Sequence, residues 1–152
     1  MLQRPQTIFL LLVALLAGLL LTGPLAVVTH GDEVYELRHN GIVNQEGIRL
    51  EVQTWPMTAL FIALAALSFF NIFSYMNRMR QMRIAIFLIF LFLGSIGMIY
   101  YYGYVMREKL EGEPLVYMWR CVIPPIAAIL AYMAFRRIRR DELLVKAYDR
   151  IR

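Results

Sequence analysis

Arg120 is the residue whose type and position most suggest chemistry, because it lies inside an apolar stretch that runs from residue 115 to residue 135. An ionisable side chain within a membrane-spanning segment is a candidate for lining a cavity or binding a charged group. Three interpretations are open. The guanidinium snorkels to lipid headgroups near the outer interface, contacts an anionic or quinone-like ligand, or pairs with an acidic residue of segment 106–114. We favour snorkelling and keep Arg120 as a candidate functional residue.

The other candidate functional residues form a basic cluster near the C-terminus: Arg136, Arg137, Arg139 and Arg140. Such a cluster attracts anionic lipid headgroups, and it also has the composition of a segment that only sets membrane topology. Apolar residues recur at helical spacing through the same tail, 136–152: Ile138, Val145, Tyr148 and Ile151. We therefore expect a cytoplasmic amphipathic helix that contacts anionic lipids and could dock on a partner protein.

Side chains suited to catalysis, metal binding or proton transfer are absent from the four apolar stretches, which contain no Asp, Glu, Lys or His. The two histidines, His30 and His39, fall in a loop, where we expect them to be solvated. Cys121 is the single cysteine, so an intrachain disulfide or a CxxC pair is excluded. We expect no enzymatic activity, no catalytic or metal-binding residue and no cofactor.

Prolines and small residues inside the apolar stretches suggest how the helices pack. Pro124-Pro125 is expected midway along the last helix and Gly23-Pro24 near the end of the first, where proline kinks a helix. Such kinks either frame a transport site or only shape the packing. Gly94 and Gly97, with the small residues of segment 63–68, predict a close approach of helices, either internal or to a partner. Asn71 is expected to donate a hydrogen bond between two helices.

Four apolar stretches, 7–28, 55–76, 84–105 and 115–135, must position these residues. The chain is 60% hydrophobic, above the roughly 45–50% of soluble domains. At 1.5 Å per residue each stretch reaches about 30 Å, the thickness of a hydrocarbon core, within which the backbone must be helical. We predict a single all-α membrane domain over residues 1–152: an antiparallel four-transmembrane-helix bundle.

The basic residues predict the orientation of this bundle. Of sixteen Lys and Arg, eleven fall at the start of the chain, in loop 77–83 and in the tail, against four in the other two loops. The richer side should be cytoplasmic, which places both termini there. Aromatic residues around 55, 100–104 and 117–119 mark the outer interface. A cleavable signal peptide is a weaker interpretation of the first stretch, which is long and lacks a clear cleavage site.

The outer loop, 29–54, predicts a small two-stranded β-hairpin. Segments 34–38 and 48–52 show the alternation of apolar and polar residues that is typical of strands. Asn40-Gly41 between them favours a tight turn. A lone hairpin is marginal in water, so we expect it to lie over the outer end of the bundle.

The two ends of the chain resemble a known family. These are the opening Met1-Leu2-Gln3-Arg4-Pro5-Gln6-Thr7, the basic segment from Arg136 to Lys146, and the closing Asp149-Arg150-Ile151-Arg152. Together they resemble an uncharacterised family of four-span membrane proteins from Bacteroidota and related bacteria, known only as a domain of unknown function. The resemblance implies a bacterial inner-membrane location. It implies no activity and no catalytic residues.

Two functions remain open on the sequence alone. The leading hypothesis is a non-catalytic accessory or scaffold subunit of a larger inner-membrane assembly. The alternative is a small oligomeric transporter or channel with Arg120 near its path. Anionic lipids at the cytoplasmic face and a membrane protein are the expected partners. The net charge of +5 is segregated by membrane side, so topology explains it and no nucleic-acid partner is expected.

Overall fold

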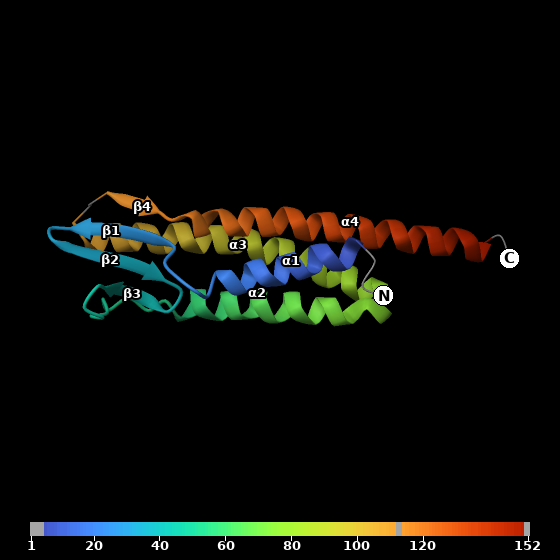
Figure 1. The fold of residues 1–152 in the computed structure, drawn as a ribbon, viewed down its shortest axis with the longest axis horizontal. Helices are drawn as coiled ribbons and strands as arrows, with labels where there is room; N and C mark the ends of the chain where they lie inside the picture. The colour runs from blue at the N-terminus through green and yellow to red at the C-terminus, as the bar shows by residue number, and fades with distance from the viewer. Residues whose placement is uncertain (1–4, 112–113, 151–152) are drawn as a thin grey trace.

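The computed structural model describes the backbone of residues 5–111 and 114–150, and the side chains of residues 7–111 and 114–144. Within these ranges the chain forms four α-helices and a four-stranded antiparallel sheet (Figure 1). The elements are α1 (Pro5–Leu19), β1 (Ala26–His30), β2 (Glu33–Arg38), β3 (Gly41–Asn44), α2 (Trp55–Phe73), the 3-10 turn η1 (Ser74–Met76), α3 (Arg78–Lys109), β4 (Leu115–Tyr117), the 3-10 turn η2 (Trp119–Val122) and α4 (Ile123–Arg150). The expected all-α architecture is therefore wrong.

Three helices in the described part of the chain are long and apolar enough to cross a membrane, where four were expected. They span Trp55–Met76, Arg78–Lys109 and Trp119–Leu144, and they are compatible with a membrane protein. The first helix, α1, has 15 residues. At 1.5 Å per residue it is about 22 Å long, short of the roughly 30 Å of a hydrocarbon core. The prediction of four transmembrane helices is therefore wrong.

The first expected span, 7–28, is shorter as a helix because its second half folds into a strand. Thr22 caps the end of α1, since its hydroxyl donates a hydrogen bond of 2.8 Å to the carbonyl of Leu19. Pro24 follows, and proline disfavours a helical conformation at the residue before it. The next residues include the β-branched run Val27-Val28-Thr29, which favours a strand. They form most of β1.

The sheet has the strand order β3-β2-β1-β4, with all neighbouring strands antiparallel. β1 and β2 are joined by a two-residue turn in which Gly31 adopts a φ of 60°. A glycine at the first turn position matches the twist of a hairpin. β4 pairs with the far edge of β1, so that Ala26 lies opposite Tyr117. The sheet thus joins two segments that the sequence analysis assigned to the ends of separate transmembrane helices.

The expected hairpin in loop 29–54 is correct in its first strand and wrong in its second. β2 covers the expected strand 34–38, but its partner is β3, and the turn is formed by His39 and Asn40. Segment 48–52 contributes only an isolated bridge between Arg49 and Val43. The reason is local: the side chain of Asn44 accepts a hydrogen bond of 2.8 Å from the backbone N–H of Ile48. This bond folds the chain back directly after β3.

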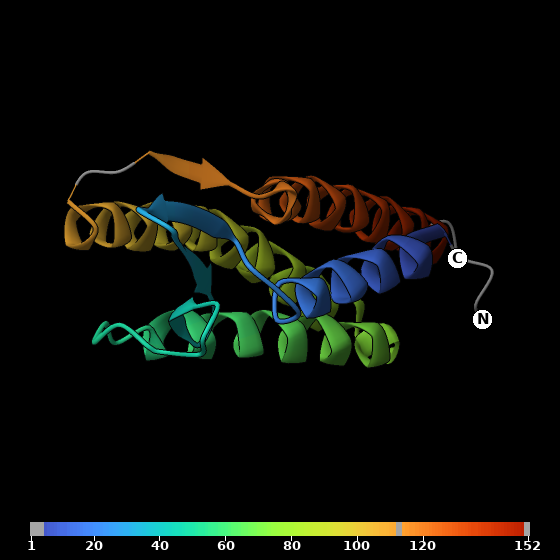
Figure 2. The same cartoon turned by 60° about the vertical axis from the view of Figure 1, so that its left-hand side comes forward.

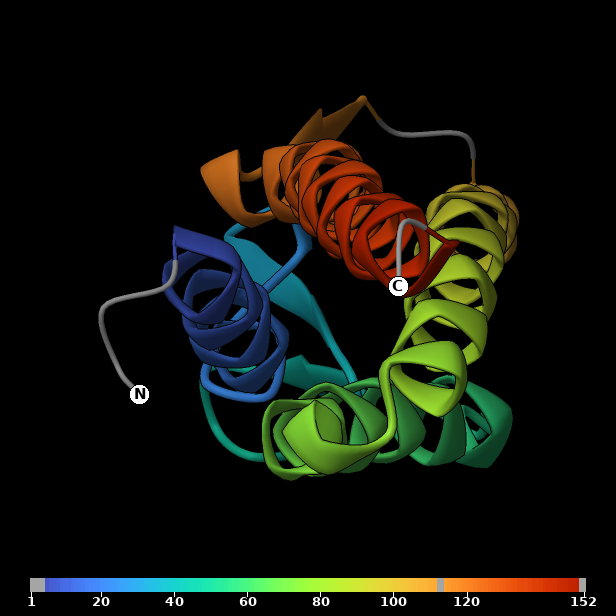
Figure 3. The same ribbon diagram turned by 90° about the vertical axis from the view of Figure 1, so that its right-hand side faces the viewer.

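The four helices pack side by side, each against two neighbours, in the order α1, α2, α3, α4 and back to α1 (Figure 3). Leu64, Leu88, Phe92 and Ala131 are fully buried between them. The sheet lies at one end of the helices, and the start of α1 and the end of α4 lie at the other (Figures 1 and 2). The short link between α2 and α3 makes them antiparallel neighbours, as predicted.

The outward faces of the helices are apolar. Large side chains are more than half exposed along them, including Phe70, Phe90, Leu93 and Ile129. So many exposed large apolar side chains are rare on soluble monomers and mark contact with a membrane or another protein. It agrees with the three helices that are able to span a membrane.

Candidate functional site

Arg120 lies in η2, the turn that precedes α4, at the sheet end of the molecule. Its Cζ is 4.8 Å from the centroid of the Trp119 ring. The other side of the guanidinium lies against Gly23, where an added Cβ would be 2.6 Å from Cζ. Arg120 is half-buried, and its Nε has no hydrogen-bond partner among the described residues. The guanidinium is therefore held by one aromatic ring and one glycine.

The three interpretations of Arg120 now differ in their support. Arg120 lies at the very start of the candidate span Trp119–Leu144. Snorkelling requires such a position, because a long side chain reaches the lipid headgroups only from near the end of a span. No ion pair joins Arg120 to Glu108 or Glu111, the described acidic residues of segment 106–114; Glu113 lies outside the described residues. Neither of the two pockets described below includes Arg120.

The basic cluster lies on α4, at the end of the molecule opposite the sheet, and all four arginines are exposed. Arg136, Arg137 and Arg140 line one pocket of about 540 Å³. Arg139 is not among its lining residues. The structure thus brings three of the four predicted arginines together. We call this the α4 pocket.

Tyr132, Met133 and Leu144 form an apolar wall of the α4 pocket, and Asp141 also lines it. Arg137 also makes a cation–π contact with α1, since its Cζ lies 5.3 Å from the centroid of the Phe9 ring. A cationic rim beside an apolar wall is suited to an anionic lipid headgroup and the start of its acyl chains. Of the expected apolar face of the tail, Ile138 is fully buried. Val145, Tyr148 and Ile151 lie outside the residues whose side chains are described.

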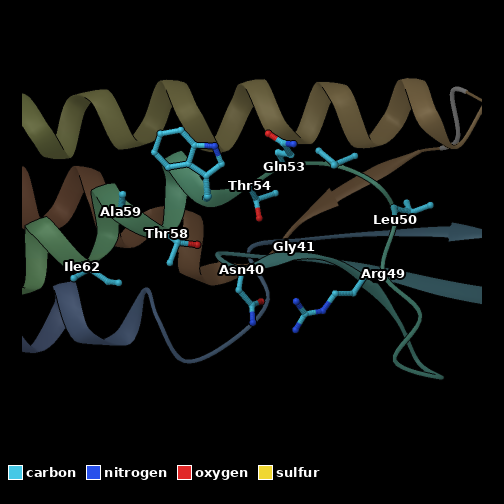
Figure 4. Close-up of a pocket in the computed structure, with 11 residues that line it drawn as sticks. Asn40, Gly41, Arg49, Leu50, Gln53, Thr54, Thr58, Ala59 and Ile62 are labelled. Atoms are coloured by element: carbon cyan, nitrogen blue, oxygen red, sulfur yellow. The ribbon is translucent and has the colours of Figure 1, made fainter.

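A second pocket, of about 480 Å³, lies where the sheet meets the start of α2 (Figure 4). We call it the sheet-end pocket. Its lining residues are Asn40, Gly41, Arg49, Leu50, Val52, Gln53, Thr54, Trp55, Thr58, Ala59 and Ile62. In Figure 4 the guanidinium of Arg49 points toward Asn40 across the open side.

Hydrogen bonds from the helices hold the walls of the sheet-end pocket in place. The hydroxyl of Thr58 on α2 donates a 2.6 Å bond to the carbonyl of His39. The hydroxyl of Tyr102 on α3 donates a 3.0 Å bond to the carbonyl of Gln53. The turn before β3 and the segment before α2 are therefore both tied to helices. Sequence analysis missed this pocket; its only local signal was Arg49 a few residues before the interfacial Trp55.

The two histidines of the outer segment are half-buried rather than solvated. Burial, with a smaller contribution from Arg38, lowers the pKa of His39 below its ordinary value. At the start of β2, the hydroxyl of Tyr35 donates a 2.6 Å hydrogen bond to Glu33, and this bond lowers the pKa of that carboxyl group. The sheet end therefore favours a neutral His39 and an ionised Glu33.

The residues expected to shape helix packing behave differently from the predictions. Pro124 and Pro125 stand in the first turn of α4, where proline costs no hydrogen bond, so they do not kink the helix. Pro24 lies in the loop between α1 and β1. Gly94 and Gly97 are exposed, and a Cβ added at either would meet nothing within 4 Å. They therefore mediate no close packing with the part of the chain that the structure describes.

Asn71 is buried, but its side-chain amide has no hydrogen-bond partner among the described residues. Its backbone carbonyl instead accepts a 3.2 Å hydrogen bond from the side chain of Gln81 on α3. A hydrogen bond thus joins α2 and α3 at Asn71, but the predicted donation by the Asn71 side chain is absent from the described residues. The described residues contain no group of three His, Cys, Asp or Glu side chains able to hold a metal ion.

Comparison with known families identifies this chain. A family model described as "Domain of unknown function (DUF4293)" matches residues 2–151. The match covers nearly the whole chain, so the protein belongs to this family, and the expectation of an uncharacterised family is confirmed. No curated protein sequence matches it significantly.

Proposed function

We propose that this DUF4293 protein is a non-catalytic accessory or scaffold subunit of a larger assembly in the bacterial inner membrane. The observation that carries the proposal is the projection of α4 beyond the ends of the other helices (Figure 1). From residue 136 to Arg150 the helix has 15 residues, about 22 Å. Among its described side chains, Arg136, Arg137, Arg139 and Arg140 are exposed, and Leu143 and Leu144 are more than half exposed. Two neighbouring exposed leucines on a projecting helix favour contact with a partner.

The helices supply the membrane anchor in this proposal. Three of them are long and apolar enough to cross a bilayer, and large apolar side chains cover their outward faces. The arginines at the start of α3 lie near those of α4, since Arg78 donates a 3.2 Å hydrogen bond to the carbonyl of Asp141. The positive-inside rule favours a cytoplasmic location for this basic end, where α1 also starts. The start of α1 and the end of α4, which lie at this same end, would then both be on the cytoplasmic side.

Anionic lipids would steady the projecting helix. The three arginines of the α4 pocket face one acidic lining residue, Asp141, so a net positive charge remains. An anionic headgroup near such residues gains on the order of 1 kcal/mol per arginine. Lipid bound here would fix α4 where it leaves the membrane and orient the exposed leucines toward the cytoplasm.

The alternative, a small oligomeric transporter or channel, has less support. It relied on proline kinks and on Arg120 facing a polar path. The prolines stand at the start of α4, and Arg120 lies between Trp119 and Gly23 at the end of the molecule. We therefore give the accessory function alone as the proposal.

Native purification tests this proposal. The full chain, tagged at its N-terminus to leave α4 free, is extracted in mild detergent, and mass spectrometry identifies what co-elutes. We expect a membrane protein in stoichiometric amount, lost when Leu143→Ser and Leu144→Ser are combined. Arg120→Ala is the control and should keep the complex. A bare monomer or a homo-oligomer carrying only lipid would overturn the proposal.

A further inference from the structure

The sheet-end pocket joins two kinds of surface. One wall is polar and comes from the turn before β3 and from Arg49 (Figure 4). The opposite wall is the first turns of α2, where Trp55 is 68% exposed and Ile62 is 54% exposed. This apolar wall is the beginning of the candidate span Trp55–Met76. The pocket therefore opens at the level where α2 would enter the hydrocarbon layer.

The polar wall carries an uncompensated positive charge. Arg49 is the only charged residue that lines the pocket, and no described residue forms an ion pair with it. Glu51, two residues away, is exposed and does not line the pocket. The nearby carboxylate of Glu36 is already paired with Arg38 at 2.7 Å. The N-terminus of α2 adds a partial positive charge at the same place.

We propose that this pocket binds an anionic phospholipid of the leaflet on the sheet side of the membrane. The phosphate lies against Arg49 and the side-chain amide of Asn40, and an acyl chain runs along Ala59 and Ile62. A volume of about 480 Å³ falls within the range of small-molecule sites and accommodates a headgroup with the first methylenes. A soluble anion would use Arg49 and leave the apolar wall uncovered, so the two-sided lining favours a lipid. This inference rests on the proposed membrane location, but not on the proposed accessory role.

Tryptophan quenching tests the inference, because Trp55 lines the pocket. The chain has two tryptophans, so Trp119→Phe leaves Trp55 as the only one. The full chain is reconstituted in phosphatidylcholine vesicles that contain phosphatidylglycerol, with brominated acyl chains on either one lipid or the other. We expect brominated phosphatidylglycerol to be preferred at Trp55 by about fivefold, the effect of one arginine near an anionic headgroup.

Substitutions distinguish binding of the lipid in the pocket from general attraction by positive surface charge. Arg49→Gln should abolish the preference, and Arg49→Lys should retain most of it. Arg38→Gln is the matched control, since Arg38 on β2 carries the same charge at the same end of the molecule but does not line the pocket. It should leave the preference unchanged.

Three results would overturn the inference. Equal quenching by both lipids would show that the pocket does not select an anionic headgroup. Equal loss with Arg38→Gln and Arg49→Gln would show an effect of surface charge without a site. Quenching by neither lipid would remove Trp55 from the bilayer and contradict the membrane location as well. Failure to co-purify a partner would leave all these quenching results unchanged, so the two proposals fail separately.

Discussion

Arg120 and Arg49 lie at the same end of the molecule but in opposite surroundings. The guanidinium of Arg120 is covered by the Trp119 ring and by Gly23. An exposed contact of this kind between a cation and an aromatic ring contributes about 0.5–1 kcal/mol. Arg49 is exposed over a pocket that it shares with no acidic side chain. The sequence points to Arg120 because it interrupts an apolar run, whereas the importance of Arg49 depends on a turn and a helix that only the fold brings together.

His39 gives a prediction about pH at the residue scale. Burial holds its folded-state pKa below the ordinary 6.5. As the pH falls, His39 therefore binds a proton in the unfolded chain at a higher pH than in the folded chain. The folded state thus has its full stability with respect to His39 above pH 6.5 and loses stability as the pH falls below that value. We expect thermal unfolding of the detergent-solubilised protein to shift to lower temperature between pH 7.5 and pH 5.5. His39→Gln should reduce this shift, and an equal shift in the variant would contradict the role of His39.

At the scale of elements, hydropathy located the apolar segments but not their secondary structure. Residues 20–28 and 115–118 are apolar enough to extend the neighbouring helices, and a short buried apolar run has no period that separates strand from helix. In the first of these segments, local signals decide for a strand: Gly23-Pro24 ends the helix, and the β-branched residues of β1 favour an extended backbone. The pairing of Ala26 with Tyr117 is a long-range contact that neither segment shows alone. The prediction of an all-α fold was wrong because these two apolar segments pair as strands.

The packing of β4 on α3 yields a prediction for Gly103. A Cβ at Gly103 would lie 3.0 Å from the Tyr117 hydroxyl oxygen and 3.1 Å from Cδ2 of Leu115. Gly103→Leu should therefore push β4 away from α3 and destabilise the protein by about 1–3 kcal/mol, the usual cost of overpacking. Reversible unfolding in mixed detergent micelles measures this free energy.

Gly97→Leu is the matched control for that substitution. It places the same side chain on the same helix, where an added Cβ meets nothing within 4 Å. We expect its free energy of unfolding to stay close to that of the natural protein. Equal destabilisation by both variants would mean that leucine perturbs α3 itself and that contact with β4 is not the cause.

The whole molecule has two chemically different ends joined by apolar helices. The sheet and the sheet-end pocket form one end, and the arginines at the start of α3 and along α4 form the other. The sequence predicted this polarity well, because the positions of basic and aromatic residues along a chain reflect the two sides of a membrane directly. Apolar length, in turn, predicted the three helices that are able to span a membrane. It could not predict the sheet-end pocket, whose walls come from a turn, an irregular segment and a helix start that are fixed by Thr58 and Tyr102.

Cysteine labelling tests the orientation of the two ends. Cys121 is the only cysteine, so Cys121→Ser gives a background into which Glu46→Cys and Leu144→Cys are introduced separately. Both positions are exposed, one near the sheet and one near the end of α4. If the basic end is cytoplasmic, a membrane-impermeant maleimide should label the Glu46→Cys variant on intact spheroplasts and the Leu144→Cys variant only after lysis. The reverse pattern would invert the topology. Labelling of both positions from outside would mean that the sheet and the C-terminal end of α4 lie on the same side of the membrane. In that case α4 would not cross the bilayer, and its exposed apolar side chains would have to be covered by protein instead of lipid.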